Sequence, residues 1–167
     1  MNKEIEFHQL LQHHKGILYK IINAYCRNEE DRKDLMQEII VQLWKSLDQY
    51  NPQYKHSTWI YRISLNISIS FYRREKRRTD FTNTFSENVL KYTPVPDANP
   101  EQEHDIQLLY QFIYELKELD KALMLLYLEK KSQREMAEII GISETNVATK
   151  ISRIKLVLKQ KFSLINK

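Results

Sequence analysis

The chain has 167 residues, a formal net charge of +4 at pH 7 and a sequence pI near 9.0. Its 2 glycines and 4 prolines leave little turn chemistry for β-hairpins, and its single cysteine excludes a disulfide framework and a cysteine-based zinc site. Because there is no signal peptide and no apolar run long enough to cross a membrane, we expect an all-α, cytoplasmic protein with a polyanionic partner.

The first predicted helix covers about residues 4–26, where apolar residues recur at helical spacing. It is either one amphipathic helix or a broken pair, and Gly16 is tolerated inside it. His8, His13 and His14 also fall here, without a cysteine or carboxylate at ligand spacing. We therefore assign them to the surface and expect no metal and no other cofactor.

A second helix is predicted over about 31–49, after a short polar break. Asp34 and Glu38 form an acidic pair four residues apart, a spacing at which like charges cost roughly a few tenths of a kcal/mol. A basic partner surface would explain why both acids are present, while the alternative is an ordinary solvated face.

The loop over residues 50–56 places aromatic and cationic side chains at the head of a third predicted helix, 57–78. Asn51-Pro52 forces a turn in this loop, and Ser57 or Thr58 is expected to cap the helix. Aromatic rings at such a position suit the gripping of an unstacked base.

The third helix is apolar nearly all round, except for one polar stripe that ends in cations. The stripe consists of Thr58, Arg62, Asn66, Ser70, Arg73, Arg74 and Arg77. Arginine suits phosphates, amide and hydroxyl groups suit base edges, and Trp59 suits stacking, so the pattern indicates nucleic-acid binding. The alternative is a core helix with a solvated basic tail, in which Trp59 belongs to the core.

Residues 79–105 are acidic and contain three of the four prolines, which predicts a flexible linker between a first domain, 1–78, and a second domain, 106–167. The second domain is expected to begin with a helix over about 108–119, followed by another from about 122.

A helix-turn-helix is predicted next in the second domain. Ser132 and Glu135 have the spacing of a capping box, Gly141 permits a tight turn, and Ser143 can cap the following helix. The following helix turns Val147, Ile151, Ile154 and Leu158 inward and its cations outward. It would enter a DNA major groove.

Three motifs occur in order: Asp34-Leu35-Met36-Gln37-Glu38, the stretch 57–66, and the helix-turn-helix around Gly141. In these motifs the chain resembles the extracytoplasmic-function sigma factors, minimal two-domain members of the bacterial primary sigma superfamily, from about Glu4 to Phe162. The resemblance implies that the chain binds core RNA polymerase and directs promoter recognition and transcription initiation, without catalytic residues or a small-molecule substrate.

The resemblance also implies three sets of site residues. The clamp helices of the polymerase would be bound by Asp34, Leu35, Gln37 and Glu38. The minus-ten element would be opened and held by Tyr54, Lys55, His56, Ser57, Thr58, Trp59, Arg62, Asn66, Ser70, Arg73, Arg74 and Arg77. The minus-thirty-five element would be bound as duplex by Ser143, Glu144, Thr145, Asn146, Thr149, Lys150 and Arg153. Because no further domain follows Lys167, we expect regulation by a separate anti-sigma factor.

The sequence leaves two other functions open as alternatives. An autonomous helix-turn-helix regulator that binds DNA as a dimer explains residues 133–155, but it leaves Trp59 and the acidic pair without a task. An enzyme acting on nucleic acid could use Glu38 as a metal ligand, but the chain lacks a second carboxylate set at site spacing and a glycine-rich phosphate loop.

Overall fold

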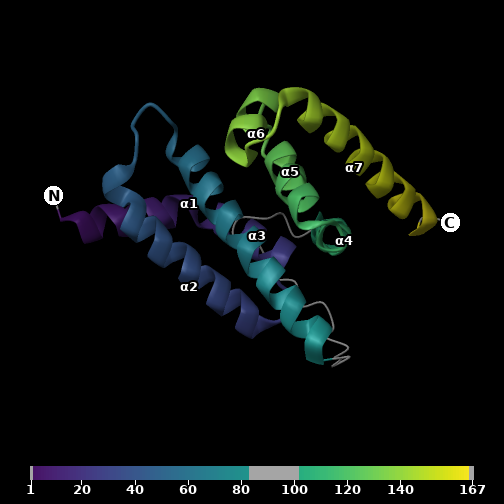
Figure 1. The fold of residues 1–167 in the computed structure, drawn as a ribbon, viewed down its shortest axis with the longest axis horizontal. Helices are drawn as coiled ribbons and strands as arrows, with labels where there is room; N and C mark the ends of the chain where they lie inside the picture. Colours follow the sequence, from purple (N-terminus) through teal and green to yellow (C-terminus); the bar gives the residue numbers. More distant parts are fainter. Residues whose placement is uncertain (1, 83–101, 166–167) are drawn as a thin grey trace. The chain divides into compact units, whose positions relative to one another are not determined.

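The computed structural model describes residues 2–82 and 102–165, and all regular structure within these ranges is helical. The predicted all-α fold is therefore confirmed. The chain divides into two compact units, Met1–Asn99 and Pro100–Lys167, which are drawn in Figure 1. Among the described residues, no helix combines the length and the apolar character that a membrane crossing needs.

The first unit is built from three long helices: α1 (Lys3–Tyr25), α2 (Glu29–Ser46) and α3 (His56–Thr82). A single 3₁₀ turn, η1 (Leu47–Gln49), follows α2. Helix α3 packs against both α1 and α2, which also pack against each other (Figure 1). Among the described residues of this unit, the largest fully buried side chains are Tyr61, Ile21, Leu35, Ile39, Leu43, Ile60 and Leu65.

Local capping explains where the first two helices begin. The Asn2 side chain accepts a hydrogen bond from the Glu4 amide at 3.1 Å, and the Asn28 side chain accepts one from the Asp31 amide at 2.7 Å. Because Asn28 is the cap, α2 starts at Glu29 and not at residue 31 as predicted. Helix α1 is continuous, so the predicted alternative of two helices separated by a break is wrong for this segment.

Helix α3 differs from its prediction at both ends. It begins at His56, so Ser57 and Thr58 lie in its first turn and do not cap it. It also extends to Thr82, past the predicted end at residue 78. Ser64 and Ser68 are fully buried on α3, and the Ser68 hydroxyl donates to the Ser64 carbonyl at 2.7 Å. These small side chains allow the neighbouring helices to approach α3 closely.

The second unit contains α4 (Glu103–Tyr114), α5 (Glu118–Leu128), α6 (Gln133–Ile140) and α7 (Glu144–Ile165). Helix α7 packs against the other three helices of this unit. Helix α4 starts and ends about five residues earlier than the predicted helix over 108–119, and Leu119 belongs to α5. The predicted linker, 79–105, lies mostly outside the described residues, which show α3 and α4 at its two edges.

The predicted helix-turn-helix is confirmed as α6 and α7. The Glu135 amide donates to the Ser132 hydroxyl at 3.1 Å, and the Ser132 amide donates to the Glu135 carboxylate at 2.8 Å, which completes the capping box. Gly141 ends α6 with a φ of 82°, a left-handed value that favours glycine. The Asn146 amide then donates to Ser143 at 3.1 Å. The core residues of α7 are Val147, Ile151, Ile154 and Leu158.

Candidate nucleic-acid interface

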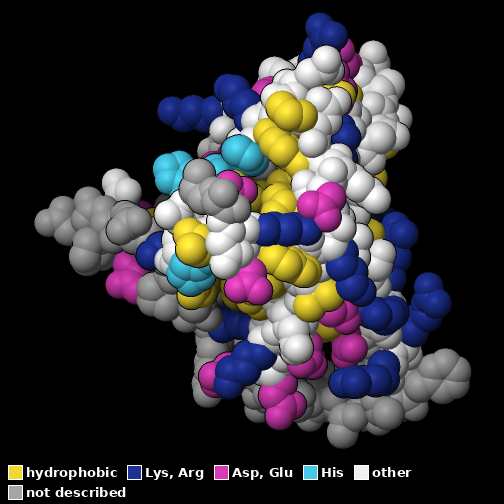
Figure 2. Space-filling model, turned by 90° about the vertical axis from the view of Figure 1, so that its left-hand side faces the viewer, with side chains coloured by type: hydrophobic (Ala, Val, Ile, Leu, Met, Phe, Trp, Pro, Cys, Tyr) yellow, Lys and Arg dark blue, Asp and Glu magenta, His cyan; other side chains and the backbone are white. Residues whose placement is uncertain are grey.

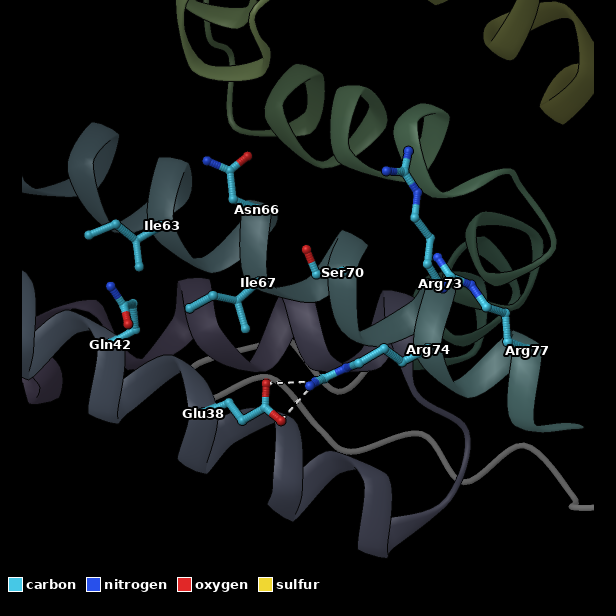
Figure 3. A pocket seen from close by; sticks show the side chains of 9 residues that line it. All are labelled: Glu38, Gln42, Ile63, Asn66, Ile67, Ser70, Arg73, Arg74 and Arg77. Carbon is cyan, nitrogen blue, oxygen red and sulfur yellow. Dashed lines mark hydrogen bonds and ion pairs between the residues drawn. The ribbon is translucent and has the colours of Figure 1, made fainter.

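An open groove lies between α2 and α3 in the first unit. Figure 3 shows the side chains that line it, which are Glu38, Gln42, Ile63, Asn66, Ile67, Ser70, Arg73, Arg74 and Arg77. Five residues of the predicted stripe are therefore brought to one surface, together with one predicted polymerase-binding residue. Ile63 and Ile67 form the apolar floor between the two helices, so the groove combines hydrogen-bonding groups, cations and apolar area.

The stripe on α3 changes character along the helix. At its start Thr58 is only 8% exposed, and the Arg62 guanidinium lies over the Tyr54 ring, 5.3 Å from the ring centroid. Farther along, Asn66 and Ser70 are exposed, and the cations follow. An amide and a hydroxyl followed by guanidinium groups can bond base edges and then phosphates along one strand.

A second hollow between the same two helices borders the first and shares Glu38 and Arg74 with it. It is lined by Asp34, Gln37, Glu38, Val41, Phe71, Arg74, Glu75 and Arg78. Asp34 and Gln37 are exposed here, whereas Leu35 is fully buried. Leu35 therefore packs α2 against the core and positions the acidic face, and its own side chain is covered by the first unit.

The aromatic side chains at the head of α3 stack on one another. His56 stacks on Tyr50 with ring centroids 4.6 Å apart, and Trp59 meets Tyr50 edge-on at 5.3 Å. Trp59 is half-buried, whereas Tyr54 and Lys55 are exposed. Tyr50 lies outside the predicted site, although its place in an aromatic loop was a signal for it. Because Tyr54 is exposed, its ring could also take up an unstacked base.

Three histidines from α1 and α3 lie close together next to this aromatic group. The ring centroids of His13 and His14 are 4.8 Å apart, and those of His14 and His56 are 6.4 Å apart. Burial lowers the pKa of His14 below its ordinary value of 6.5, and the nearby His13 and His56 lower it further. Within residues 2–82 and 102–165, no group of three histidine, cysteine or acidic side chains has an arrangement that could hold a metal ion.

Charge on the molecular surface is mixed on the face that Figure 2 shows. Lysine and arginine side chains alternate there with aspartate and glutamate, and hydrophobic side chains are exposed between them. On this face a polyanion would therefore meet local clusters of cations and not one continuous basic surface.

In the second unit, most of the predicted duplex-binding residues are exposed on α7 or immediately before it. The exposed ones are Ser143, Glu144, Thr145, Asn146, Thr149 and Arg153. Lys150 is different, because it is half-buried and its ammonium lies 3.6 Å from the Asp120 carboxylate of α5. Ser152 was not predicted, but it is exposed on the face of Thr149, three residues farther along the helix.

Comparison with protein-family models matches both units. The model of sigma-70 region 2 matches residues 10–78, and the model of sigma-70 region 4 matches residues 106–158. The two matches cover most of the chain, in the order of the family. The chain therefore belongs to the sigma-70 family of RNA polymerase sigma factors.

Individual relatives narrow this assignment. The ECF RNA polymerase sigma factor SigW of Bacillus subtilis (strain 168) is 24% identical over 163 residues, which cover 92% of this chain and 87% of SigW. Together with the two family matches, such relatives make this chain an extracytoplasmic-function sigma factor. As an RNA polymerase sigma factor, it binds core polymerase and directs promoter recognition.

Two solved structures share the fold. The structure of CnrH, a sigma factor of Cupriavidus metallidurans, in complex with the cytosolic domain of CnrY has a TM-score of 0.68 at 20% identity, covering 98% of this chain and 91% of that one. The structure of sigma factor RpoE in complex with the anti-sigma factor NepR from Bartonella quintana has a TM-score of 0.76 at 16% identity. The match covers 97% of this chain and 98% of that one.

Proposed function

We propose that the two units divide the work of this sigma factor. Residues 1–78 would bind core polymerase and open the minus-ten element, residues 106–167 would bind the minus-thirty-five element, and 79–105 would link them. The observation that carries this proposal is the groove between α2 and α3, which has acidic and amide groups on one wall and hydrogen-bonding groups and cations on the other.

The polymerase contact is assigned to the exposed face of α2. Asp34 and Gln37 project there one turn apart, with Glu38 beside them, on a helix that Leu35 fixes to the core. Acidic groups on a rigid helix suit a basic partner surface, because complementary charge speeds encounter and fixes orientation.

The minus-ten contact is assigned to α3 and the loop before it. Asn66 and Ser70 would bond base edges of the opened strand, Arg73 and Arg77 would bond its phosphates, and the Tyr54 ring would stack on a base. The half-buried or buried members of the predicted set would support this surface from behind; they are Ser57, Thr58, Trp59 and Arg62.

The minus-thirty-five contact is assigned to the first turns of α7. Asn146 can bond an adenine edge, Glu144 can accept from cytosine, and Arg153 can reach a phosphate or a guanine. Lys150 would contribute less because Asp120 already holds it. This arrangement follows the general docking of a helix-turn-helix in the major groove.

We also propose that the protein acts in the cytoplasm under a separate anti-sigma factor. The anti-sigma part is supported by CnrH and RpoE, each of which was solved in complex with another protein, which for RpoE is an anti-sigma factor. Such a factor would compete with core polymerase for the chain.

The proposal is tested by reconstituting the full chain with core RNA polymerase and sequencing the 5′ ends of the transcripts. We expect starts downstream of two shared sequence elements at a fixed spacing. Asp34→Lys should abolish co-elution with core polymerase, whereas Glu29→Lys, an equal change at an exposed position on a different face of α2, should preserve it. Asn66→Ala should keep co-elution but weaken open-complex formation by about 1–3 kcal/mol. Unaltered co-elution of Asp34→Lys would contradict the α2 assignment.

A further inference from the structure

An ion pair joins the two surfaces to which the first unit's tasks are assigned. One guanidinium nitrogen of Arg74, on α3, lies 2.8 and 2.9 Å from the two carboxylate oxygens of Glu38, on α2 (Figure 3). The same guanidinium lies 5.6 Å from the centroid of the Phe71 ring. Arg74 is thus turned back over α2, whereas the neighbouring Arg73 points away from it (Figure 3).

The pair stands between the two hollows. Glu38 and Arg74 are the two residues that line both the groove with Asn66 and Arg77 and the hollow with Asp34. The Glu38 carboxylate therefore belongs to the proposed polymerase surface but is bound by Arg74 in the free chain. Arg74 in turn belongs to the proposed DNA surface but is bound by Glu38.

We propose that the Glu38–Arg74 pair makes polymerase binding and DNA binding interdependent. In the free chain the two charges satisfy each other, so the carboxylate is not offered to a basic partner and the guanidinium is not offered to a phosphate. When a cation of the polymerase takes Glu38, Arg74 is released toward the groove. This inference rests on the proposed function, because it needs α2 to contact the polymerase and α3 to contact the promoter strand.

The exposure of the pair makes this exchange feasible. The side chains are 58% and 43% exposed, so both can change partners without unfolding any part of the unit. Exposed pairs are weak compared with the contacts a large partner offers. Since coupling between two ligands is reciprocal, a strand that draws Arg74 into the groove must strengthen polymerase binding by the same factor.

The first test uses the full chain without polymerase and a short fluorescein-labelled single-stranded oligodeoxynucleotide of mixed sequence. Glu38→Gln should tighten binding about two- to fivefold, because it releases one cation. It should also steepen the dependence of log K on log salt by about 0.7, the value for one more phosphate contact on a single strand. Adding Arg74→Gln to Glu38→Gln should remove the gain.

Glu30→Gln is the matched control, since it removes the same charge from an exposed position of α2 away from the pair. An equal gain from Glu30→Gln and Glu38→Gln would mean that net charge alone is responsible, and it would overturn the inference. A gain that persists in the Glu38→Gln, Arg74→Gln double variant would overturn it as well.

The second test measures how much a saturating strand strengthens the binding of the chain to core polymerase. This factor should be larger for the wild type than for Arg74→Gln, whereas Arg77→Gln, which removes a cation from the same groove and leaves the pair in place, should keep the wild-type factor. A wild-type chain that fails to bind core polymerase or the strand would contradict the proposed function. If the chain binds both polymerase and strand, but the strand strengthens polymerase binding equally for the wild type and Arg74→Gln, only the role of the pair would be contradicted.

Discussion

Gly16 lies in the interior of α1, where glycine is normally unfavourable because the unfolded chain has more freedom to lose. A Cβ added at Gly16 would have no heavy atom within 4 Å, so alanine fits without strain. We expect Gly16→Ala to raise the free energy of unfolding of the first unit by about 0.5–1 kcal/mol. Urea unfolding followed by tryptophan fluorescence measures this, since Trp44 and Trp59 are the chain's 2 tryptophans.

Gly141 is the matched control for this prediction. It also has open space around an added Cβ, but its φ is 82°. Gly141→Ala should therefore destabilise the second unit, by about 1–2 kcal/mol, through backbone strain alone. Circular dichroism measures the change in stability. A stabilising effect would mean that the open space around the added Cβ, and not the left-handed backbone conformation, determines the effect of this substitution.

His14 predicts a dependence of stability on pH. Its folded pKa is lowered by burial and by His13 and His56, so the unfolded chain binds this proton more readily than the folded one. The free energy of unfolding should therefore fall as the pH drops below the unfolded value of 6.5, until the folded pKa is passed.

Urea unfolding at pH about 7.5 and about 5.5 checks this sign. His14→Gln should lose less stability between the two pH values than the wild type. His8→Gln, which changes an exposed histidine on the same helix, should behave as the wild type does. A loss that is equal in all three proteins would assign the pH dependence to other groups.

At the scale of elements, α7 carries two kinds of cation. Arg153 is exposed, whereas Lys150 is held at 3.6 Å by Asp120. Arg153→Ala should weaken the binding of the holoenzyme to a duplex minus-thirty-five fragment and reduce the salt slope by about 0.9, the loss of one phosphate contact. Lys150→Ala should change the affinity and the slope less.

Filter-binding or anisotropy titrations over a series of salt concentrations measure both quantities. Equal losses for the two variants would show that Lys150 leaves Asp120 when DNA is bound. Ser152→Ala tests the residue that the sequence did not indicate, and a measurable loss on one promoter but not on another would assign it a base contact.

The helix-turn-helix was predictable from sequence because its determinants are local. The side chains of Ser132 and Glu135 each form a hydrogen bond with the other residue's backbone within one turn. The left-handed φ of Gly141 depends only on the conformation of that residue. The start of α3 was not predictable in the same way. Ser57 and Thr58 are residue types that can cap a helix, but this does not tell whether the helix has already begun before them. Long-range contacts were beyond the pattern altogether: the acid at Glu38 was recognised, but its partner Arg74 lies 36 residues away.

At the scale of the whole molecule, the two-unit division has a direct spectroscopic consequence. The 2 tryptophans, at positions 44 and 59, belong to the first unit, whereas helices of both units contribute to circular dichroism. If the units are independent, as the proposed domains 1–78 and 106–167 require, the two signals need not share one transition. The boundaries at 78 and 106 themselves stay predictions.

We expect Gly141→Ala to shift part of the circular dichroism transition and to leave the tryptophan transition where it is in the wild type. Thermal unfolding of the full chain with both probes measures this. Coincident shifts of both signals would mean that the two units unfold as one cooperative body, and the tether proposed for 79–105 would then be wrong.

On α7 the buried face that packs against the core is separate from the exposed face proposed to bind DNA, and this affects how the promoter specificity of such a protein can evolve. The side chains that hold the helix in place, Val147, Ile151, Ile154 and Leu158, are distinct from the exposed ones at its first turns. A substitution at Thr145, Asn146 or Thr149 leaves the hydrophobic core untouched, so it changes stability little. A duplicated copy of the gene could therefore acquire a new set of target promoters in a few steps, each of which leaves a folded protein.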